Sequence, residues 1–233
     1  MKLNLRRSDE RGHANRGWLD RWHTFSFGDY HDPQHMGFRS LRVINQDTIA
    51  PSSGFPTHPH RDMEIFSYVL DGELEHQDSM GNGRRLKPGE IQLMSAGSGV
   101  THSEYNPSVD KEGHFLQIWI QPHAKGLEPS YTEWHPNTSD IAEGKVLLIS
   151  PDGRDRSATI HQDAFIWRIE LQKGESVQHD VANGRGVWLQ VIRETLKIGE
   201  LELSAGDALS TEDTGDFEIQ ATADAEALLF DLK

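Results

Sequence analysis

The sequence predicts an all-β fold of two stacked antiparallel β-barrels of the jelly-roll type, with few short helices. Short apolar runs that alternate with polar residues are separated by Gly-containing turns, a pattern typical of sandwiches and barrels. Helical periodicity is not sustained anywhere in the 233 residues. The second half of the chain also repeats the strand and turn pattern of the first half, which predicts two similar units.

The first half contains six stretches with strand character. Asp71-Gly72 joins two of them and predicts a tight turn, because Gly accepts the positive φ that such turns require. Near the N-terminus, the alternation of aromatic residues predicts a strand with Phe25 and Phe27 facing inward. The strands predicted in this half are residues 22–27, 39–49, 63–70, 73–77, 91–94 and 115–120.

A change of composition marks the boundary between the two predicted barrels. Residues 122–144 are rich in Pro, Glu, Thr, Asn and Ser, as linkers are. We therefore expect a first barrel over residues 1–132, a linker over 133–144 and a second barrel over 145–233. The strands predicted in the second half are residues 146–149, 166–171, 187–192, 201–203, 217–220 and 227–231.

Composition and charge exclude several classes of function. The formal net charge is −14, with 37 acidic and 23 basic residues, so direct binding of nucleic acid is not expected. The chain has no cysteine, which excludes disulfides, thiolate metal sites and cysteine nucleophiles. No apolar stretch is long enough to span a membrane, and residues 1–8 do not resemble a signal peptide. We expect a cytoplasmic protein.

The candidate metal ligands of the chain lie between residues 55 and 106. His58 and His60 are two residues apart and share one face of a strand, as do His102 and Glu104. Two such pairs on facing strands would bring three imidazoles and one carboxylate to one point. This donor set suits one divalent metal, with Fe(II) preferred and Mn, Ni, Co, Cu or Zn as alternatives, and no organic cofactor is required.

A second carboxylate also has the right spacing for this site. Glu64 has the same parity as His60, so the residues alone leave Glu64 and Glu104 as alternative acids.

The repeat in the second half carries no comparable set of ligands. Residues 69–75 align with 191–197, and residues 87–93 align with 204–210 across a shorter hairpin. Carried through, this alignment predicts that the second barrel has no metal. The counterparts of His58, His60, His102 and Glu104 are Asp180, Ala182, Ile219 and Ala221.

The spacing H-x-H-x3-E, then P-G, then G-x-G-x-x-H-x3-N resembles the two motifs of the cupin superfamily, although Gly97 stands where many cupins have Pro. More specifically, the chain is similar to the pirin family, and most closely to its bacterial members with quercetin 2,3-dioxygenase activity. The match is dense in the first half of the chain and looser in the second. The segments that carry this resemblance are residues 12–13, 17–20, 23–27, 35–38, 41–45, 58–64 and 102–106.

The resemblance implies a bicupin with one metal, held in the first barrel by the four residues that match the pirin ligands. These are His58, His60, His102 and Glu104. Cupins in general take their carboxylate from the position of Glu64, but the pirin pattern favours Glu104. Glu64 would then orient a ligand imidazole or lie at the rim, and His23 is expected beside the ligands or in the core.

The implied reaction opens the heterocycle of a flavonol such as quercetin with O2 and releases a depside and carbon monoxide. Glu104 would act as the base for the flavonol hydroxyl. Because ligand histidines must be neutral, metal loss is expected below about pH 6, near the reference histidine pKa. Four further residues are expected either to stack on a planar substrate at the mouth of the site or to lie in the core, and they are Phe38, Met63, Phe66 and Trp119.

A second function is open at this point. Eukaryotic pirins resemble metal-dependent transcriptional co-regulators, so the chain could be a redox-sensing module that binds a protein partner. A sugar or keto-acid isomerase would share the same scaffold, because fold does not determine function. Oxygen uptake with quercetin distinguishes the enzyme from the binding module.

Overall fold

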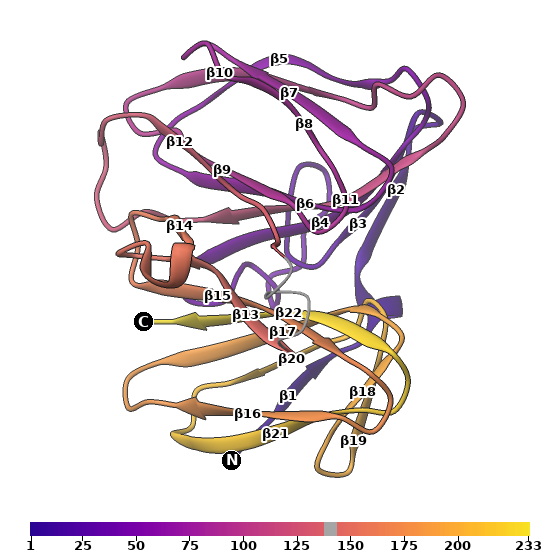
Figure 1. The fold of residues 1–233 in the computed structure, drawn as a ribbon, viewed down its shortest axis with the longest axis vertical. Coiled ribbons are helices and arrows are strands. Elements are labelled where there is room, and N and C mark those ends of the chain that lie inside the picture. Colours follow the sequence, from indigo (N-terminus) through magenta and orange to yellow (C-terminus); the bar gives the residue numbers. More distant parts are fainter. Residues whose placement is uncertain (138–143) are drawn as a thin grey trace. The chain divides into compact units, whose positions relative to one another are not determined.

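The computed structural model describes residues 1–137 and 144–233, and its regular secondary structure is almost entirely β-strand (Figure 1). The helices in this part of the chain are two short 3-10 turns, η1 (Ser8–Glu10) and η2 (Arg154–Arg156). The predicted all-β class is confirmed. No helix among the described residues has the length and apolar character needed to cross a membrane.

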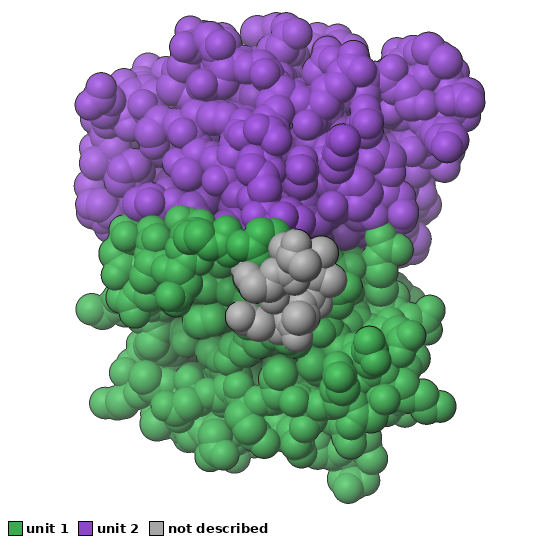
Figure 2. Space-filling model, in the orientation of Figure 1, with its two compact units in different colours: residues 1–11, 137–157, 163–233 green, residues 12–136, 158–162 purple. Residues whose placement is uncertain are grey.

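The described residues divide into two compact units (Figure 2). One, called the first unit below and coloured purple in Figure 2 (unit 2 of its key), contains residues 12–136 and 158–162. The other, called the second unit below and coloured green (unit 1 of the key), contains residues 1–11, 137, 144–157 and 163–233. The structure differs from the predicted first barrel over residues 1–11. Strand β1 (Asn4–Arg6) pairs with β20 (Ala208–Thr211), and Leu3 and Leu5 pack against the core of that second unit.

The unit that holds residues 12–136 contains two antiparallel sheets. One is ordered β5 (Gly54–His60), β10 (Val100–Tyr105), β7 (Leu74–Asp78) and β8 (Gly83–Leu86). The larger sheet is ordered β12 (Ser130–Trp134), β9 (Ile91–Ser95), β6 (Glu64–Asp71), β11 (Gly113–Ile120), β4 (Leu41–Ile49), β3 (Leu19–His23) and β2 (Gly12–Asn15).

The other unit also has a small and a large sheet. The small sheet is ordered β16 (Ser176–Val181), β21 (Gly215–Ala221), β18 (Thr195–Ile198) and β19 (Leu201–Ser204). The large one contains β1, β20, β17 (Gly186–Arg193), β22 (Ala225–Leu232), β15 (Ala164–Leu171) and β13 (Lys145–Ser150) in that order. A two-residue strand, β14 (Ala158–Thr159), belongs to the first unit.

Two sequence predictions are corrected by this topology. The strand predicted at 22–27 corresponds to β3, which ends at His23. Beyond it, Gly28 has a φ of +57° and the chain turns, so that Phe27 forms a bridge with Tyr30. The predicted linker at 133–144 begins inside β12, which pairs with β9 through Tyr131 and its neighbours. Residues 138–143 of that linker lie outside the described residues.

Two apolar clusters lie on the interior face of the larger sheet in the first unit, and they include Leu74, Leu86 and Val100 of the smaller sheet. One contains Ile65, Met94 and Val100, with Trp119 packed against it. The other contains Leu19, Ile49, Val69, Leu74, Leu86 and Phe115. On β6 the residue between Ile65 and Val69 on this face is Ser67, so the clusters lie on either side of a polar position.

We predict that Gly54→Ala destabilises the first unit. A Cβ at this position on β5 would lie 2.2 Å from the carbonyl oxygen of Glu104 and 2.6 Å from Tyr105 Cα. Both are backbone atoms of β10, so relief of the overlap requires a shift of the paired strand. We expect a loss of about 1–3 kcal/mol in the free energy of unfolding, measured by urea denaturation.

Gly83→Ala is the matched control, because its added Cβ would meet Gln77 Cγ at 3.7 Å, an ordinary contact. Equal stability of the two variants would contradict this account of β5 and β10.

Candidate metal and substrate site

The candidate ligands lie on β5 and β10, which are hydrogen-bonded neighbours in one sheet and not facing strands. His58 pairs with His102, and Phe55 pairs with Glu104. The register therefore shifts by one residue between these pairs, with the extra residue on β5. Because directly paired residues project to the same side, the two ligand pairs share one face, and Phe55 joins them there.

Three imidazoles meet on this face. The ligand nitrogens of His58, His60 and His102 all lie within 4.8 Å of one another. His58 Nε2 is 3.1 Å from His102 Nε2. Two nitrogens about 2.1 Å from one metal and at right angles to each other would be roughly 3 Å apart, so this spacing fits a shared ion. The donor set and its spacing fit the predicted divalent metal.

Hydrogen bonds orient two of these rings. His58 Nδ1 lies 2.8 Å from the carbonyl oxygen of Pro56, to which it donates, so Nε2 carries the lone pair. His102 Nδ1 is 3.4 Å from His76 Nδ1, and His76 Nε2 is 3.4 Å from a carboxylate oxygen of Asp78. This buried chain ends on an acceptor, which favours donation from His102 to His76 and from His76 to Asp78.

Burial keeps two of the imidazoles neutral. Desolvation, together with the neighbouring His102 and His58, lowers the pKa of His60 to about 4. Desolvation, together with His58 and His76, lowers the pKa of His102 to about 3. Both rings are therefore unprotonated at neutral pH, the form that binds a metal.

The carboxylate of Glu104 is buried and held by two side chains of the larger sheet. Gln117 Nε2 donates to Glu104 Oε2 at 2.5 Å, and the Ser67 hydroxyl lies 2.8 Å from Oε1. Glu104 forms a second group of possible ligands with His76 and His102, all buried. His102 belongs to both groups and so links this carboxylate to the other imidazoles.

A row of buried polar residues crosses the interior face of the larger sheet beneath the site. Each member is directly opposite the next on neighbouring strands, so their side chains share that face. Ser67 Oγ contacts Gln117 Oε1 at 2.9 Å, and His23 Nδ1 contacts Asn45 Oδ1 at 2.8 Å. In order across β3, β4, β11, β6 and β9, the row is His23, Asn45, Gln117, Ser67 and Gln92.

Glu64 does not take the role predicted for it. Its carboxylate accepts from the Ser95 hydroxyl at 2.7 Å and lies 3.4 Å from His161 Nδ1, and His161 belongs to neither ligand group. The predicted parity with His60 is broken because β5 ends at His60 and Asp62 turns the chain with a φ of +52°. Glu64 therefore lies on the face of β6 opposite Ser67.

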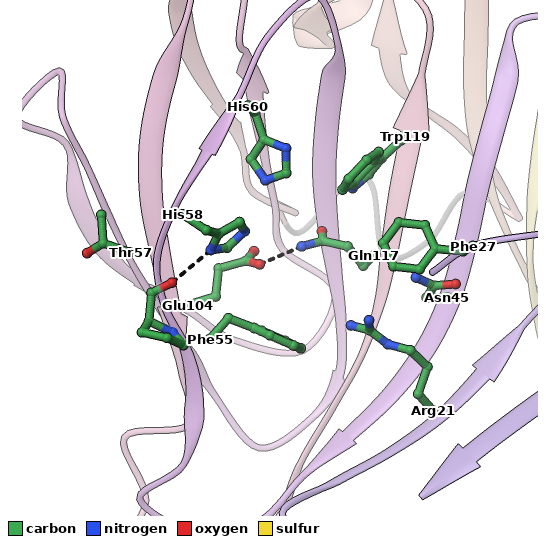
Figure 3. Close-up of a pocket in the computed structure, with 11 residues that line it drawn as sticks. Arg21, Phe27, Asn45, Phe55, Thr57, His58, His60, Glu104, Gln117 and Trp119 are labelled. Atoms are coloured by element: carbon green, nitrogen blue, oxygen red, sulfur yellow. Dashed lines mark hydrogen bonds between the residues drawn. The ribbon is translucent and has the colours of Figure 1, made fainter. Parts of the chain in front are cut away.

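A pocket of 330 Å³ opens beside the histidines (Figure 3). This volume lies within the range of about 300–1,000 Å³ typical of small-molecule sites. Asn45 Nδ2 and Trp119 Nε1 are buried and have no hydrogen-bond partner among the described residues. The residues that line the pocket are Arg21, Phe27, Asn45, Phe55, Pro56, Thr57, His58, His60, Glu104, Gln117 and Trp119.

Of the four residues predicted at the mouth, Trp119 lines this pocket, with its ring 4.9 Å from that of His60. Phe38, Met63 and Phe66 are not among its described lining residues, which corrects the prediction for this pocket. Phe66 is fully buried on the same face of β6 as Glu64, Met63 packs against the Ile65 cluster, and Phe38 forms a backbone bridge with Leu41.

His23 lies beside the pocket and not beside the ligands. It is buried, hydrogen-bonded to Asn45, and stacked at 5.8 Å on both Phe27 and Tyr30. Burial lowers the pKa of its imidazole, and the hydrogen bond to Asn45 opposes this effect.

The sequence predictions missed His76, Asp78 and most of the aromatic wall. His76 and Asp78 carried a usable signal, because they alternate on β7 just as His58 and His60 alternate on β5. No pattern in the sequence predicted the position of Phe55, because the extra residue on β5 places its side chain on the face opposite to the one that strict alternation predicts.

In the other unit, the counterparts of two ligands are part of the apolar core. Ile219 and Ala221 are buried in the cluster that also contains Leu189 and Leu229. His179, next to the aligned Asp180, contacts Asp231 at 3.2 Å.

Comparison with known proteins places the chain in a family. Residues 4–120 match the Pirin family, and residues 147–232 match the family described as "Quercetinase C-terminal cupin domain". "Quercetin 2,3-dioxygenase" of Escherichia coli K12 is 50% identical over 99% of this chain and 98% of its own length. A "Pirin-like protein" of Caulobacter vibrioides is 39% identical over 96% of each chain.

Solved structures agree with this assignment. The bacterial pirin YhhW of Escherichia coli, solved in complex with nickel(II), is 49% identical, covers 99% of each chain and superimposes with a TM-score of 0.94. The predicted bicupin architecture and the predicted resemblance are both confirmed. This chain belongs to the pirin family of bicupin proteins.

Proposed function

We propose that this protein is a metal-dependent dioxygenase that opens the heterocycle of flavonols such as quercetin with O2, releasing a depside and carbon monoxide. The observation that carries the proposal is the meeting of three imidazoles, two of which line an aromatic pocket. A relative that is 50% identical over nearly the whole chain is named quercetin 2,3-dioxygenase, which supports this substrate class.

We propose His58, His60, His102 and Glu104 as the ligands of one divalent ion. A bound ion would supply the electronic coupling between a flavonol oxygen and dioxygen, so no organic cofactor is needed. Fe(II) and Ni(II) are the ions to test first, the latter because a related pirin was solved with nickel(II).

The chain's own groups would position the substrate and move its proton. Phe27, Phe55 and Trp119 offer aromatic surfaces for a planar flavonol. Glu104 is the proposed base for the flavonol hydroxyl. Gln117 and Ser67 hold the two oxygens of this carboxylate, so its orientation is set before substrate arrives.

We predict that protein loaded with Fe(II) or Ni(II) consumes oxygen when quercetin is added, and that His60→Ala lowers kcat/KM by more than about a hundredfold. Loss of one imidazole removes a proposed ligand, an effect larger than the 10–100-fold that follows loss of residues behind the ligands. Oxygen uptake and metal content are the measurements.

His31→Ala is the control, because His31 is exposed and lies outside both ligand groups. If wild-type protein with a full complement of metal takes up no oxygen, the enzyme proposal fails, and a module that binds a protein partner becomes the better account.

We predict that His60 and His102 of the metal-free protein titrate near pH 4 and pH 3, because burial lowers the pKa of each ring to about these values. In the unfolded chain both would titrate near pH 6.5, so the unfolded state takes up protons first. The stability of the metal-free protein should therefore fall as the pH falls from about 6.5 towards 4.

Protons also compete with the metal for these two rings only below about pH 4, lower than the pH 6 expected from the sequence. NMR titration of the imidazole resonances tests this prediction. Midpoints near 6.5 for both rings would contradict it.

We predict that His76→Phe weakens metal binding by about 10–100-fold while His58, His60 and His102 remain in place. The phenyl ring fills the buried space but cannot accept from His102 or donate to Asp78. Isothermal titration with Ni(II) measures the change. Glu75→Gln, the next residue on β7 and on its opposite face, is the control. Equal affinity in both variants would show that the buried chain does not orient His102.

A further inference from the structure

The wall of the pocket that lies across from the histidines is polar as well as aromatic. Figure 3 shows His58 and His60 on one side of the pocket and Arg21 and Asn45 on the other, with Phe27 above them. A guanidinium has no lone pair to offer a metal, and the side-chain oxygen of Asn45 already accepts from His23, so neither residue is a proposed ligand. Their role in this pocket is therefore separate from the role proposed for the histidines.

Asn45 presents a buried donor that nothing in the described chain satisfies. Its residue is 1% exposed, its Oδ1 accepts from His23 Nδ1 at 2.8 Å, and its Nδ2 has no partner among the described residues. In Figure 3 the amide nitrogen points towards the centre of the pocket. Buried donors in folded proteins almost always have an acceptor, so this one indicates an oxygen supplied from outside the chain.

Arg21 is held rigidly beside it. Its Nε and Nη2 donate to the two oxygens of Asp47 at 2.6 and 2.5 Å, and Asp47 is fully buried. The guanidinium carbon lies 5.0 Å from the ring of Phe55 and 5.5 Å from that of Phe27. These two bonds use Nε and Nη2 but not Nη1, and Arg21 lines the pocket.

The pairing with Asp47 also determines what Arg21 can recognise. A bidentate carboxylate neutralises the charge of the guanidinium, so the pair is better suited to an uncharged oxygen than to a free anion. The aromatic rings on either side favour a planar ligand. A phenol hydroxyl on an aromatic ring satisfies both conditions.

We propose that Asn45 and Arg21 form the recognition end of the pocket and donate hydrogen bonds to a hydroxyl oxygen on the flavonol ring farthest from the histidines. The two residues thereby make the site specific for polyhydroxylated flavonols over the bare ring system. This inference deepens the proposed function and rests on it for the identity of the substrate class.

The test compares quercetin with 3-hydroxyflavone, which has the same ring system but none of the other hydroxyls. Dissociation constants from quenching of tryptophan fluorescence and kcat/KM from oxygen uptake are measured for both ligands on metal-loaded protein. We expect wild type to favour quercetin by at least about tenfold, as a site that hydrogen-bonds a hydroxyl disfavours a ligand without it. Asn45→Leu should reduce this preference by about tenfold, through weaker binding of quercetin.

Gln46→Leu is the matched control. Gln46 is the next residue on β4, faces the opposite side of the sheet, and contacts His114 at 3.0 Å. Gln46→Leu changes an amide to an apolar side chain, as Asn45→Leu does, and should leave the preference for quercetin unchanged.

Arg21 requires a paired substitution, because its removal alone would leave the buried Asp47 carboxylate without a countercharge. The double variant Arg21→Met/Asp47→Leu removes both charges and keeps similar volumes. We expect it to reduce the preference for quercetin as Asn45→Leu does, with little change in the binding of 3-hydroxyflavone.

An unchanged ratio of the two dissociation constants in both Asn45→Leu and the double variant would overturn the proposal. If wild type binds quercetin with the expected preference but consumes no oxygen, the enzyme proposal fails while the recognition proposal stands. The binding and turnover readouts therefore separate the two.

Discussion

The pairing register between β5 and β10 is the constraint on which the candidate site depends. His58 lies opposite His102, and the extra residue on β5 brings Phe55 opposite Glu104. A slip of one residue moves every side chain of a strand to the other face, so it would separate the imidazoles of β5 from His102. Pro56 and Pro59 are compatible with this arrangement because β5 is the edge strand of its sheet.

The opposite wall meets a second requirement, which is to place polar groups in an apolar interior. In the row from His23 to Gln92, hydrogen bonds join His23 to Asn45 and Ser67 to Gln117, and the row lies between two apolar clusters. Gln117 and Ser67, which belong to this row, form hydrogen bonds to the carboxylate of Glu104. Asn45 is the member whose donor remains open to the pocket, so the network that orients the acid also presents a group to a ligand.

Features that depend on residues close together in the chain could be predicted from the sequence. The alternation of His58 with His60 and of His102 with Glu104 specifies a shared face within each strand. Gly72, with a φ of +76°, makes the predicted turn between β6 and β7, although these two strands belong to different sheets. The all-β class and the bicupin repeat follow from the same kind of signal.

The remaining features depend on interactions between distant parts of the chain. The row beneath the site joins five strands whose register no local pattern encodes, which is why Asn45 and Gln117 were not predicted. Glu64 was placed with His60 by parity, but the turn at Asp62 resets that parity. Strand β1 pairs with β20, more than two hundred residues later in the chain, so it could not be assigned to the second unit in advance.

Anomalous diffraction from crystals of the nickel-loaded protein tests the central claim most directly. The account predicts one peak about 2.1 Å from a nitrogen of each of His58, His60 and His102, with Glu104 completing the set. A peak bound only by the group His76, His102 and Glu104, or one in the unit formed by residues 163–233, would contradict it.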